Sequence, residues 1–277
     1  MVMLRGLLGL LATIALAAGC GSPLANEQRL LPKGFEHPAF IVQSWDATGT
    51  LLIGGRNGVR RSNDGGRTWH LTGRAVYGAR TAAFTSGSTI VSRGKLFQRG
   101  TLAYDRVNSP QRAPFDTRAM TWLPGGTLYA ATRGTALALH VSINSGRSWN
   151  DLPALGLPRG VDAIAAGRVD GGSDVLFAAC GKDGLWRSDD GGISFARSKL
   201  AGADIGSVAT TPAQWGRVVV ATPEIAYSDD FGATWTRIGT NAVLVAADPR
   251  NERVFFATTD AGTVIVSRDG GRTFTDG

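Results

Sequence analysis

Three aspartates stand at comparable positions in the chain, each just ahead of a run of small and apolar residues: Asp116, Asp162 and Asp204. Two carboxyl groups about 5 to 10 Å apart can hydrolyse a glycosidic bond, one as a general acid and the other as a base or nucleophile. Aspartate also caps turns by accepting backbone hydrogen bonds, so turn capping is the alternative interpretation. These three carboxylates are therefore candidate catalytic groups, with a purely structural role as the alternative.

A second set of candidates is basic and could hold an anionic group of a ligand: Arg56, Arg80, Arg93, Arg118, Arg133 and Lys182. Residues 51–118 contain 12 Lys/Arg against 3 Asp/Glu, whereas residues 119–277 contain 14 against 16. This asymmetry predicts a basic sector that attracts an acidic protein, peptide or glycan. The alternative is the ordinary solvated surface of an arginine-rich protein.

The remaining reactive side chains form no recognisable site. The three histidines are scattered, and no Gly-rich phosphate loop or Ser/His/Asp grouping stands out. Of the two cysteines, Cys180 lies in an apolar run and is expected to be a small buried hydrophobe. We expect no metal, no cofactor and no nucleic-acid partner, since no base-stacking module is recognisable.

A repeated octet indicates which elements position the candidate residues. Five segments follow the pattern Ser-x-Asp/Asn-x-Gly-x-Ser/Thr-aromatic, and their first residues are 80, 46, 40 and 39 residues apart. A sixth, eroded copy is expected near residue 102, where Ala103-Tyr104-Asp105 retains the acid. A period near 40 with three β-rich runs before each octet is typical of four-stranded blades. The residues that define the five octets are Ser62, Asp64, Gly66, Trp69, Ser142, Asn144, Gly146, Trp149, Ser188, Asp190, Gly192, Phe195, Ser228, Asp230, Gly232, Trp235, Ser267, Asp269, Gly271 and Phe274.

These octets resemble the BNR or Asp-box repeat of sialidases, sortilin-type receptors and some xyloglucanases. In such a hairpin the acid accepts backbone hydrogen bonds, the glycine permits positive φ, and the ring buries area between sheets. The resemblance implies an all-β fold, a β-propeller of six or seven four-stranded blades. It also implies that the box residues are structural and that a ligand would bind on the opposite face, where the candidate aspartates and basic residues are expected.

The closure of this ring is open in the sequence. Only Phe274 to Gly277 follow the last octet, too few residues for a full fourth strand. Residues Gln28 to Leu31 could supply that strand from the other end of the chain. The alternative is that residues 21–34, which are rich in Pro, Gly and polar residues, form only a tether.

The first residues look like an export signal. Arg5 precedes an apolar segment, Gly6 to Gly19, that is too short to span a bilayer comfortably. The stretch Leu16-Ala17-Ala18-Gly19-Cys20 resembles a bacterial lipobox, which implies a lipid on Cys20 and a location at the outer face of the cytoplasmic membrane or the periplasmic side of the envelope. An ordinary signal peptide with an incidental cysteine is the alternative. The implied domains are a cleaved signal peptide over 1–19, a lipid-anchored tether over 20–34 and a single β-propeller over 35–277.

The resemblance to sialidases can be tested on the residues that those enzymes require. Sialidases carry an Arg-Ile-Pro motif before the first box, and the corresponding stretch here reads Leu31-Pro32-Lys33-Gly34-Phe35. They also pair a tyrosine nucleophile with a glutamate, whereas Glu224 and Tyr227 are three residues apart on one expected strand and face opposite sides. The sequence therefore favours a monomeric, non-catalytic binding module for a protein, peptide or glycan. A propeller that assists photosystem II assembly is similar in repeat type, export and basic patch. The alternative function is a sialidase-like or other glycoside hydrolase, intact or degenerate, at the cell surface.

Overall fold

The computed structural model describes residues 30–276 apart from residues 34, 36, 45–48, 73–76, 86–87, 101–110, 133–138, 170–171, 201–203 and 212–215. Every regular element in this part of the chain is a β-strand, as apolar runs between Gly and Asp turns predict. Within the described ranges no helix is long and apolar enough to cross a membrane. The predicted signal segment, the candidate lipid site Cys20 and the candidate ligand residue Arg133 lie outside the described residues.

The strands, in chain order, are β1 (Phe40–Gln43), β2 (Leu51–Gly55), β3 (Gly58–Ser62), β4 (His70–Leu71), β5 (Thr81–Thr85), β6 (Ser88–Ser92), β7 (Gly94–Gly100), β8 (Gln111–Leu123), β9 (Thr127–Thr132), β10 (Leu139–Ser142), β11 (Asn150–Leu152), β12 (Ala163–Arg168), β13 (Asp174–Ala179), β14 (Leu185–Ser188), β15 (Ala196–Arg197), β16 (Ser207–Thr210), β17 (Val218–Ala221), β18 (Ile225–Ser228), β19 (Thr236–Arg237), β20 (Leu244–Ala247), β21 (Phe255–Thr258) and β22 (Val264–Ser267).

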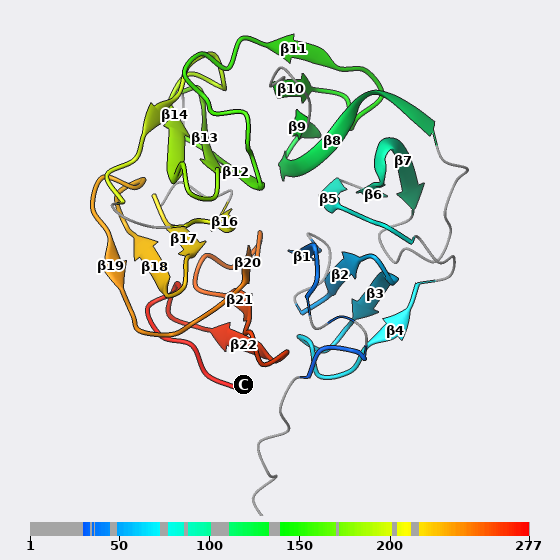
Figure 1. Ribbon diagram of the computed structural model, residues 1–277, viewed down its shortest axis with the longest axis vertical. Coiled ribbons are helices and arrows are strands. Elements are labelled where there is room, and N and C mark those ends of the chain that lie inside the picture. Colours follow the sequence, from blue (N-terminus) through cyan, green and yellow to red (C-terminus); the bar gives the residue numbers. More distant parts are fainter. Residues whose placement is uncertain are drawn as a thin grey trace, which may run out of the picture.

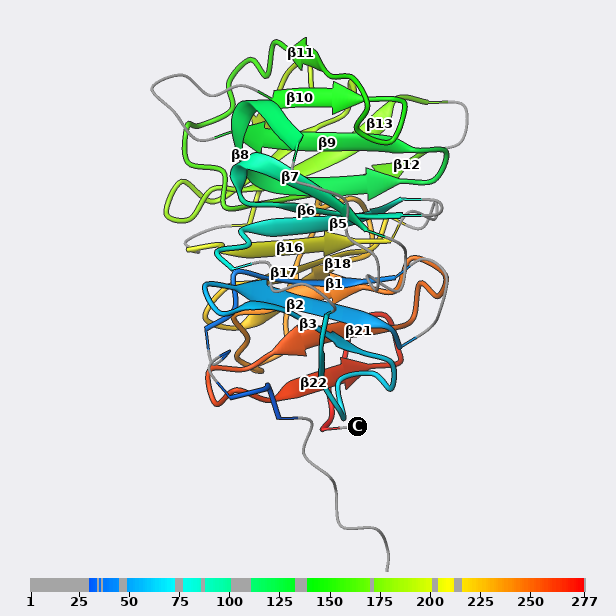
Figure 2. The ribbon, with the colours of Figure 1, turned by 90° about the vertical axis from the view of Figure 1, so that its right-hand side faces the viewer.

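Hydrogen bonds join these strands into five antiparallel sheets that stand around a common axis (Figure 1). Three sheets have four strands each, β1–β4, β12–β15 and β16–β19, while β20–β22 has three and β5–β11 has seven. The innermost strands β1, β5, β8, β12, β16 and β20 contact one another in a closed cycle, in which β20 returns to β1. In the side view the strands run along the axis of the ring (Figure 2). The chain is therefore an all-β propeller, as the repeats predict.

Strand β8 explains why there are fewer sheets than predicted blades. Its first residues pair with β7, for example Gln111 with Phe97, and its last residues pair with β9, for example Leu123 with Thr127. One continuous strand thus belongs to two neighbouring groups of strands and joins them into the seven-stranded sheet. The prediction of six or seven blades is not confirmed by this count of five sheets. The eroded box expected near residue 102 falls in 101–110, outside the described residues.

Segments from both ends of the chain lie along the outer edge of β22. Leu30 forms an antiparallel bridge with Thr263, and the N–H of Leu31 donates to the carbonyl of Gly262 at 2.8 Å. Further along the same strand, Val266 is bridged to Thr275, with backbone hydrogen bonds of 2.9 and 3.0 Å in the two directions. The last sheet is therefore completed by short contacts from both ends of the chain. Of the closing strand considered at Gln28 to Leu31, Leu30 and Leu31 make these contacts, and Gln28 lies outside the described residues.

Each Asp box is a turn held by its own side chains. In the box after β14, the Ser188 hydroxyl donates to Asp190 Oδ1 at 2.7 Å and accepts the N–H of Gly192 at 2.8 Å. The Asp190 carboxylate in turn accepts the N–H of Ser194 at 2.9 Å and its hydroxyl at 2.5 Å. The boxes that begin at Ser62, Ser228 and Ser267 repeat the same four bonds.

These hydrogen bonds favour the ionised form of the box carboxylates. Burial raises the pKa of Asp190, but the hydrogen bonds from Ser194, Ser188 and the N–H of Ile193 outweigh burial and lower the pKa to about 2. The hydroxyl of Thr234 is the main cause that lowers the pKa of Asp230 to about 2. The remaining box, after β10, has the neutral Asn144 in place of the aspartate. Its amide group Nδ2 donates to the Ser148 hydroxyl at 2.7 Å, so the contact is kept without a charge.

The second glycine of a box also touches the sheet that precedes it in the ring. At Gly192, where φ is +94°, a Cβ would come within 2.8 Å of Leu139 and 3.0 Å of Leu152. At Gly271, where φ is +85°, a Cβ would lie 2.6 Å from Val219. Only glycine satisfies both the positive φ and this close approach, so the box sets the spacing between neighbouring sheets.

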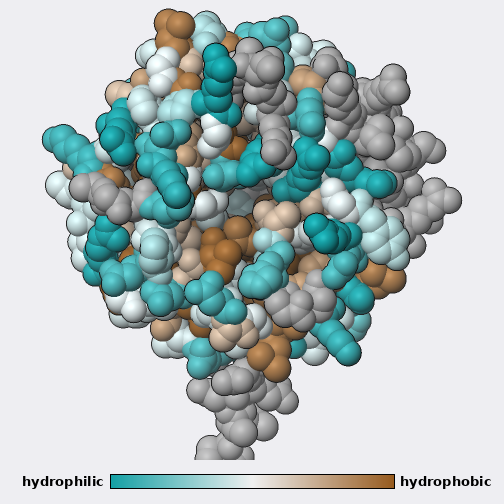
Figure 3. Space-filling view, in the orientation of Figure 1, coloured by the Kyte–Doolittle hydropathy of each residue, from teal (hydrophilic) through white to brown (hydrophobic). Residues whose placement is uncertain are grey.

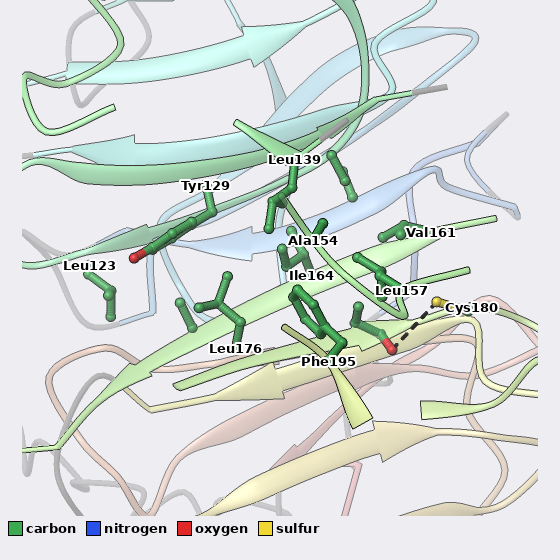
Figure 4. Close-up of a cluster of buried hydrophobic side chains, with 14 residues drawn as sticks. Leu123, Tyr129, Leu139, Ala154, Leu157, Val161, Ile164, Leu176, Cys180 and Phe195 are labelled. Atoms are coloured by element: carbon green, nitrogen blue, oxygen red, sulfur yellow. Dashed lines mark hydrogen bonds between the residues drawn. The ribbon is translucent and has the colours of Figure 1, made fainter. Parts of the chain in front are cut away.

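The aromatic residue that ends each box is packed between sheets. Phe195, which is 7% exposed, lies in one cluster with Leu139 and Leu176, and Figure 4 shows these side chains converging between the two sheets. Burial of such a ring contributes about 1.5–3 kcal/mol. Cys180 belongs to the same cluster, and burial together with the nearby Asp162 and Asp183 raises the pKa of its thiol to about 12, so it is an unreactive core residue. The other box aromatics pack in the equivalent clusters: Trp69, Trp149, Trp235 and Phe274.

We expect Gly192→Ala to lower the free energy of unfolding by about 2–4 kcal/mol, because it combines a strained φ with a clash against Leu139. Gly262→Ala is the matched control, since Gly262 also has positive φ (+75°) but nothing within 4 Å of its Cβ position. The control should cost only about 1–2 kcal/mol. Chemical denaturation of both variants measures the difference, and equal losses would show that the contact between sheets contributes nothing.

Asp230→Asn should make the protein less sensitive to acid. The folded pKa of Asp230 is about 2, below the value of about 3.9 in an unfolded chain, so its ionised form stabilises the fold above about pH 4. That contribution is lost as the pH falls through about 2. We expect the variant to be less stable than the parent by about 1 kcal/mol at pH 7, after solvent screening, and nearly equal to it at pH 2. Thermal unfolding from pH 7 to pH 2 provides the measurement; a constant gap over this range would contradict the assignment.

Candidate functional site

The sheets present two faces, and the candidate residues gather on one of them. The Asp boxes follow the third strand of each sheet and lie on the face where the innermost strands end. The opposite face, here called the mouth face, carries the beginnings of the innermost strands and the turns between second and third strands, for example Arg56–Asn57 between β2 and β3. Backbone geometry alone therefore separates the structural boxes from the residues with potential ligand contacts.

A channel of about 170 Å³ runs along the axis between the innermost strands. Its wall is mostly small and apolar, with larger side chains at Phe40, Met120 and Leu244. Figure 3, which looks along the axis, shows hydrophobic surface near the middle of the ring within a more hydrophilic border. Such an apolar hollow with a polar rim is the usual form of a ligand site.

Two arginine–aspartate pairs form part of the rim of this channel. Arg80, just before β5, donates from Nη1 to Asp116 Oδ1 in β8 at 2.9 Å. Arg118 in β8 pairs through Nη2 with Oδ1 of Asp162, just before β12. Each arginine thus reaches the next innermost strand, and these two candidate carboxylates are each occupied by a guanidinium. Arg80, Arg118 and Asp162 also border the channel itself.

The third candidate carboxylate is in a different situation. Asp204 is exposed, and in the described part of the chain its side chain makes no hydrogen bond or ion pair. Its Oδ1 lies 3.4 Å from the position that a Cβ on Gly181 would take, and Asp162 Oδ2 lies 3.2 Å from the same position. The turn at Gly181 is therefore bordered by the carboxylates of Asp162 and Asp204. Among the described residues, these are the only two of the three candidate carboxylates that lie beside the same turn.

The candidate basic residues are spread around the mouth face. Arg56 is exposed in the turn between β2 and β3, and Arg93 is half-buried in the turn between β6 and β7. Lys182 is exposed in the turn between β13 and β14. In contrast, Arg80 and Arg118 are engaged with aspartates, a feature that the sequence analysis missed. The signal that could have found it is a separation of 36 and 44 residues between opposite charges, close to one repeat.

The remaining histidine and carboxylate side chains are the groups that a metal site would use. No group of three or more His, Cys, Asp or Glu side chains among them could hold a metal ion. The histidine His140 is buried and its Nδ1 lies 2.7 Å from Asp151 Oδ1, while its ring stacks on Phe115 at a centroid distance of 3.7 Å. Burial is the main cause that lowers the pKa of His140, so this histidine is neutral at pH 7 and serves packing between strands.

Comparison with known proteins agrees with this architecture. The BNR/Asp-box repeat family matches residues 226–237, which are most of β18, its box and β19. A xyloglucanase from Paenibacillus sp. is 33% identical over 154 residues, which cover 48% of this chain and 15% of the xyloglucanase, so the chain spans a small part of that relative.

Two solved structures resemble the fold at low sequence identity. YCF48 bound to D1 peptide has a TM-score of 0.56 and 16% identity, covering 90% of this chain and 82% of that one. A GH74 enzyme of Niastella koreensis has a TM-score of 0.55 and 16% identity, covering 83% of this chain and 36% of that one. At this identity the likeness concerns the fold alone. The hydrogen-bonded boxes, the closed cycle of innermost strands and these matches identify the chain as a β-propeller built from BNR/Asp-box repeats.

Proposed function

We propose that this chain is a non-catalytic binding module whose mouth face holds a protein, peptide or glycan at the opening of the axial channel. The observation that carries the proposal is the apolar channel with a charged rim, in which Arg80–Asp116 and Arg118–Asp162 occupy two of the three candidate carboxylates. A hydrolase would need those carboxylates free to exchange protons with a substrate. A binding surface instead needs rigid, oriented charges, which ion pairs between innermost strands supply.

Two finer features belong to the same proposal. We propose that the ring has six blades; the support is that β5–β7 with the first part of β8, and the last part of β8 with β9–β11, each have the four-strand arrangement of a blade. The predicted lipid on Cys20 would hold the module on the outer face of a membrane as a monomer. The Asp boxes leave the mouth face available to a partner in that arrangement, since each of the five described boxes lies on the opposite face.

A glycoside hydrolase is the second candidate, and two observations favour it. Asp162 and Asp204 border the same turn at Gly181, and a relative of 33% identity over part of the chain bears the name xyloglucanase. The Arg118 contact on Asp162 argues for the binding module, because it removes one oxygen of the pair from catalysis.

The binding proposal predicts that Arg118→Ala weakens ligand binding far more than it weakens the fold. We expect the full chain, screened against arrays of short peptides and of glycans, to retain specific members, and the variant to bind them at least about tenfold more weakly. The free energy of unfolding should fall by less than about 1 kcal/mol, since the pair is partly exposed. Arg168→Ala, which removes a guanidinium of similar exposure from the more buried Asp174 where β12 ends, is the matched control and should bind normally. Equal binding by all three proteins would overturn the proposal.

The hydrolase alternative predicts turnover, and the binding module predicts none. Purified chain incubated with xyloglucan and with aryl β-glycosides should release no reducing sugar or aryl alcohol above the rate of Asp204→Asn and Asp162→Asn variants. Release that is lost in both variants would establish the hydrolase and sink the non-catalytic proposal.

A further inference from the structure

Within the described ranges, the mouth face carries arginines without an acidic partner on one side and carboxylates without a basic partner on the other, and these side chains indicate the chemistry of the ligand. We propose that the site takes a peptide segment of mixed charge, an inference that rests on the proposed binding function. An acidic side chain of the peptide faces the turns of β2–β3 and β6–β7, a basic side chain faces Asp204, and an apolar side chain between them enters the channel.

One side has guanidinium groups that the protein leaves available. Arg56 and Arg93 make no side-chain hydrogen bond or ion pair within the described part of the chain. They stand in turns that follow β2 and β6, on either side of the start of β5. A carboxylate of a ligand would meet them without first displacing an internal partner, which favours association.

The other side of the mouth face carries carboxylates. Asp183, Asp204, Glu224 and Asp260 stand in turns or connections of the mouth face between β13 and β22, and none of their carboxylates has a hydrogen bond or ion pair among the described residues. Three cations border these turns. Lys182 lies in the β13–β14 turn, the Arg197 guanidinium lies 3.5 Å from the position of a Cβ on Gly184, and Arg237 Nη1 donates to the Thr222 hydroxyl at 3.5 Å. Among the described residues, none of the three forms an ion pair with the four carboxylates. In this part of the chain the two sides therefore differ in their unpartnered side chains: Arg56 and Arg93 lack an acidic partner on one side, and the four carboxylates lack a basic partner on the other.

The repeat itself indicates what is missing beside Asp204. At the turn after β6, a Cβ on Gly94 would meet Asp116 Oδ1 at 2.6 Å and Arg80 Nη1 at 3.5 Å, so an arginine and an aspartate share that position. At the equivalent turn after β13, Gly181 is bordered by two carboxylates, Asp162 and Asp204.

Asp162, just before β12, takes the position at the Gly181 turn that Arg80, just before β5, takes at the Gly94 turn. Asp162 has its own cation in Arg118, and Asp204 has none. A lysine or arginine side chain of a bound peptide would supply the charge that Arg80 supplies within the protein, two innermost strands away.

The channel supplies the third contact and accounts for an apolar residue. Behind Arg118 and Asp162 the wall consists of residues such as Ala119, Met120 and Ile164. An aliphatic side chain that enters this opening loses contact with water, which contributes about 25 cal/mol per Å² of apolar surface. A neutral glycan would use neither the free arginines nor Asp204, so a peptide with both charges fits the surface better.

The test is a double-mutant cycle between the peptide and the protein. The probe is a short fluorescein-labelled peptide with a central leucine, a glutamate on one side of it and a lysine on the other, compared with its Lys→Gln and Glu→Gln versions. We expect the full chain to bind the mixed-charge peptide about tenfold or more tightly than either version in fluorescence polarisation at low salt, with the difference reduced by added salt.

Asp204→Asn should abolish the difference between the lysine and glutamine peptides and leave the glutamate preference intact. Arg93→Gln should abolish the difference between the glutamate and glutamine peptides and leave the lysine preference intact. Asp276→Asn is the matched control, because it removes the same charge at an exposed residue beside the outer edge of β22 and should change nothing.

The outcomes separate this inference from the binding function on which it rests. Binding of the three peptides with equal affinity, or a lysine preference that survives in Asp204→Asn, would overturn the inference while the binding function stands. Retention of neutral glycans with no peptide bound would do the same. If neither peptides nor glycans bind at all, both the inference and the binding function are wrong.

Discussion

The whole ring depends on one turn, in which a serine, an acid and a glycine satisfy one another. The Ser188 hydroxyl bridges Asp190 and the N–H of Gly192, and the carboxylate then closes the turn through Ser194. Because the serine hydroxyl, the carboxylate and the glycine N–H are partners of one another, the glycine can pack against the preceding sheet without leaving its N–H unsatisfied. The turn consequently defines both the hairpin and its distance from the neighbouring sheet, and its repetition generates the circle.

That circle separates structure from recognition. The boxes place their hydrogen bonds on one face and their aromatic residues between sheets, so the other face can vary in charge without loss of the fold. On the mouth face the same repeat yields an arginine opposite Asp116 and a second carboxylate opposite Asp204. A scaffold of near-equivalent units thus acquires polarity across its axis, which a symmetric ring would lack.

The repeats could be predicted from the sequence, but the side-chain contacts between neighbouring repeats could not. Five octets in phase predicted the propeller, and in the structure Asp116, Asp162 and Asp204 lie in or just before innermost strands, on the mouth face. The arginine partners could not be predicted in the same way, because each belongs to the preceding innermost strand and meets its aspartate only when the sheets stand side by side. The number of separate sheets could not be predicted for a similar reason: a period reveals repeating units, but it does not show where a single strand such as β8 continues from one unit into the next.

The shared strand β8 has a consequence for how the molecule opens. In a ring of separate sheets each sheet can detach from its neighbour by loss of side-chain packing alone. Between β7 and β9 such detachment must also bend or break a strand of 13 residues whose two halves are hydrogen-bonded on opposite flanks. Strands β5 to β11 therefore form one cooperative unit in local unfolding, and amide exchange should slow over this third of the ring as a single block, while the edge of β22, covered only by isolated bridges, is where the circle opens first.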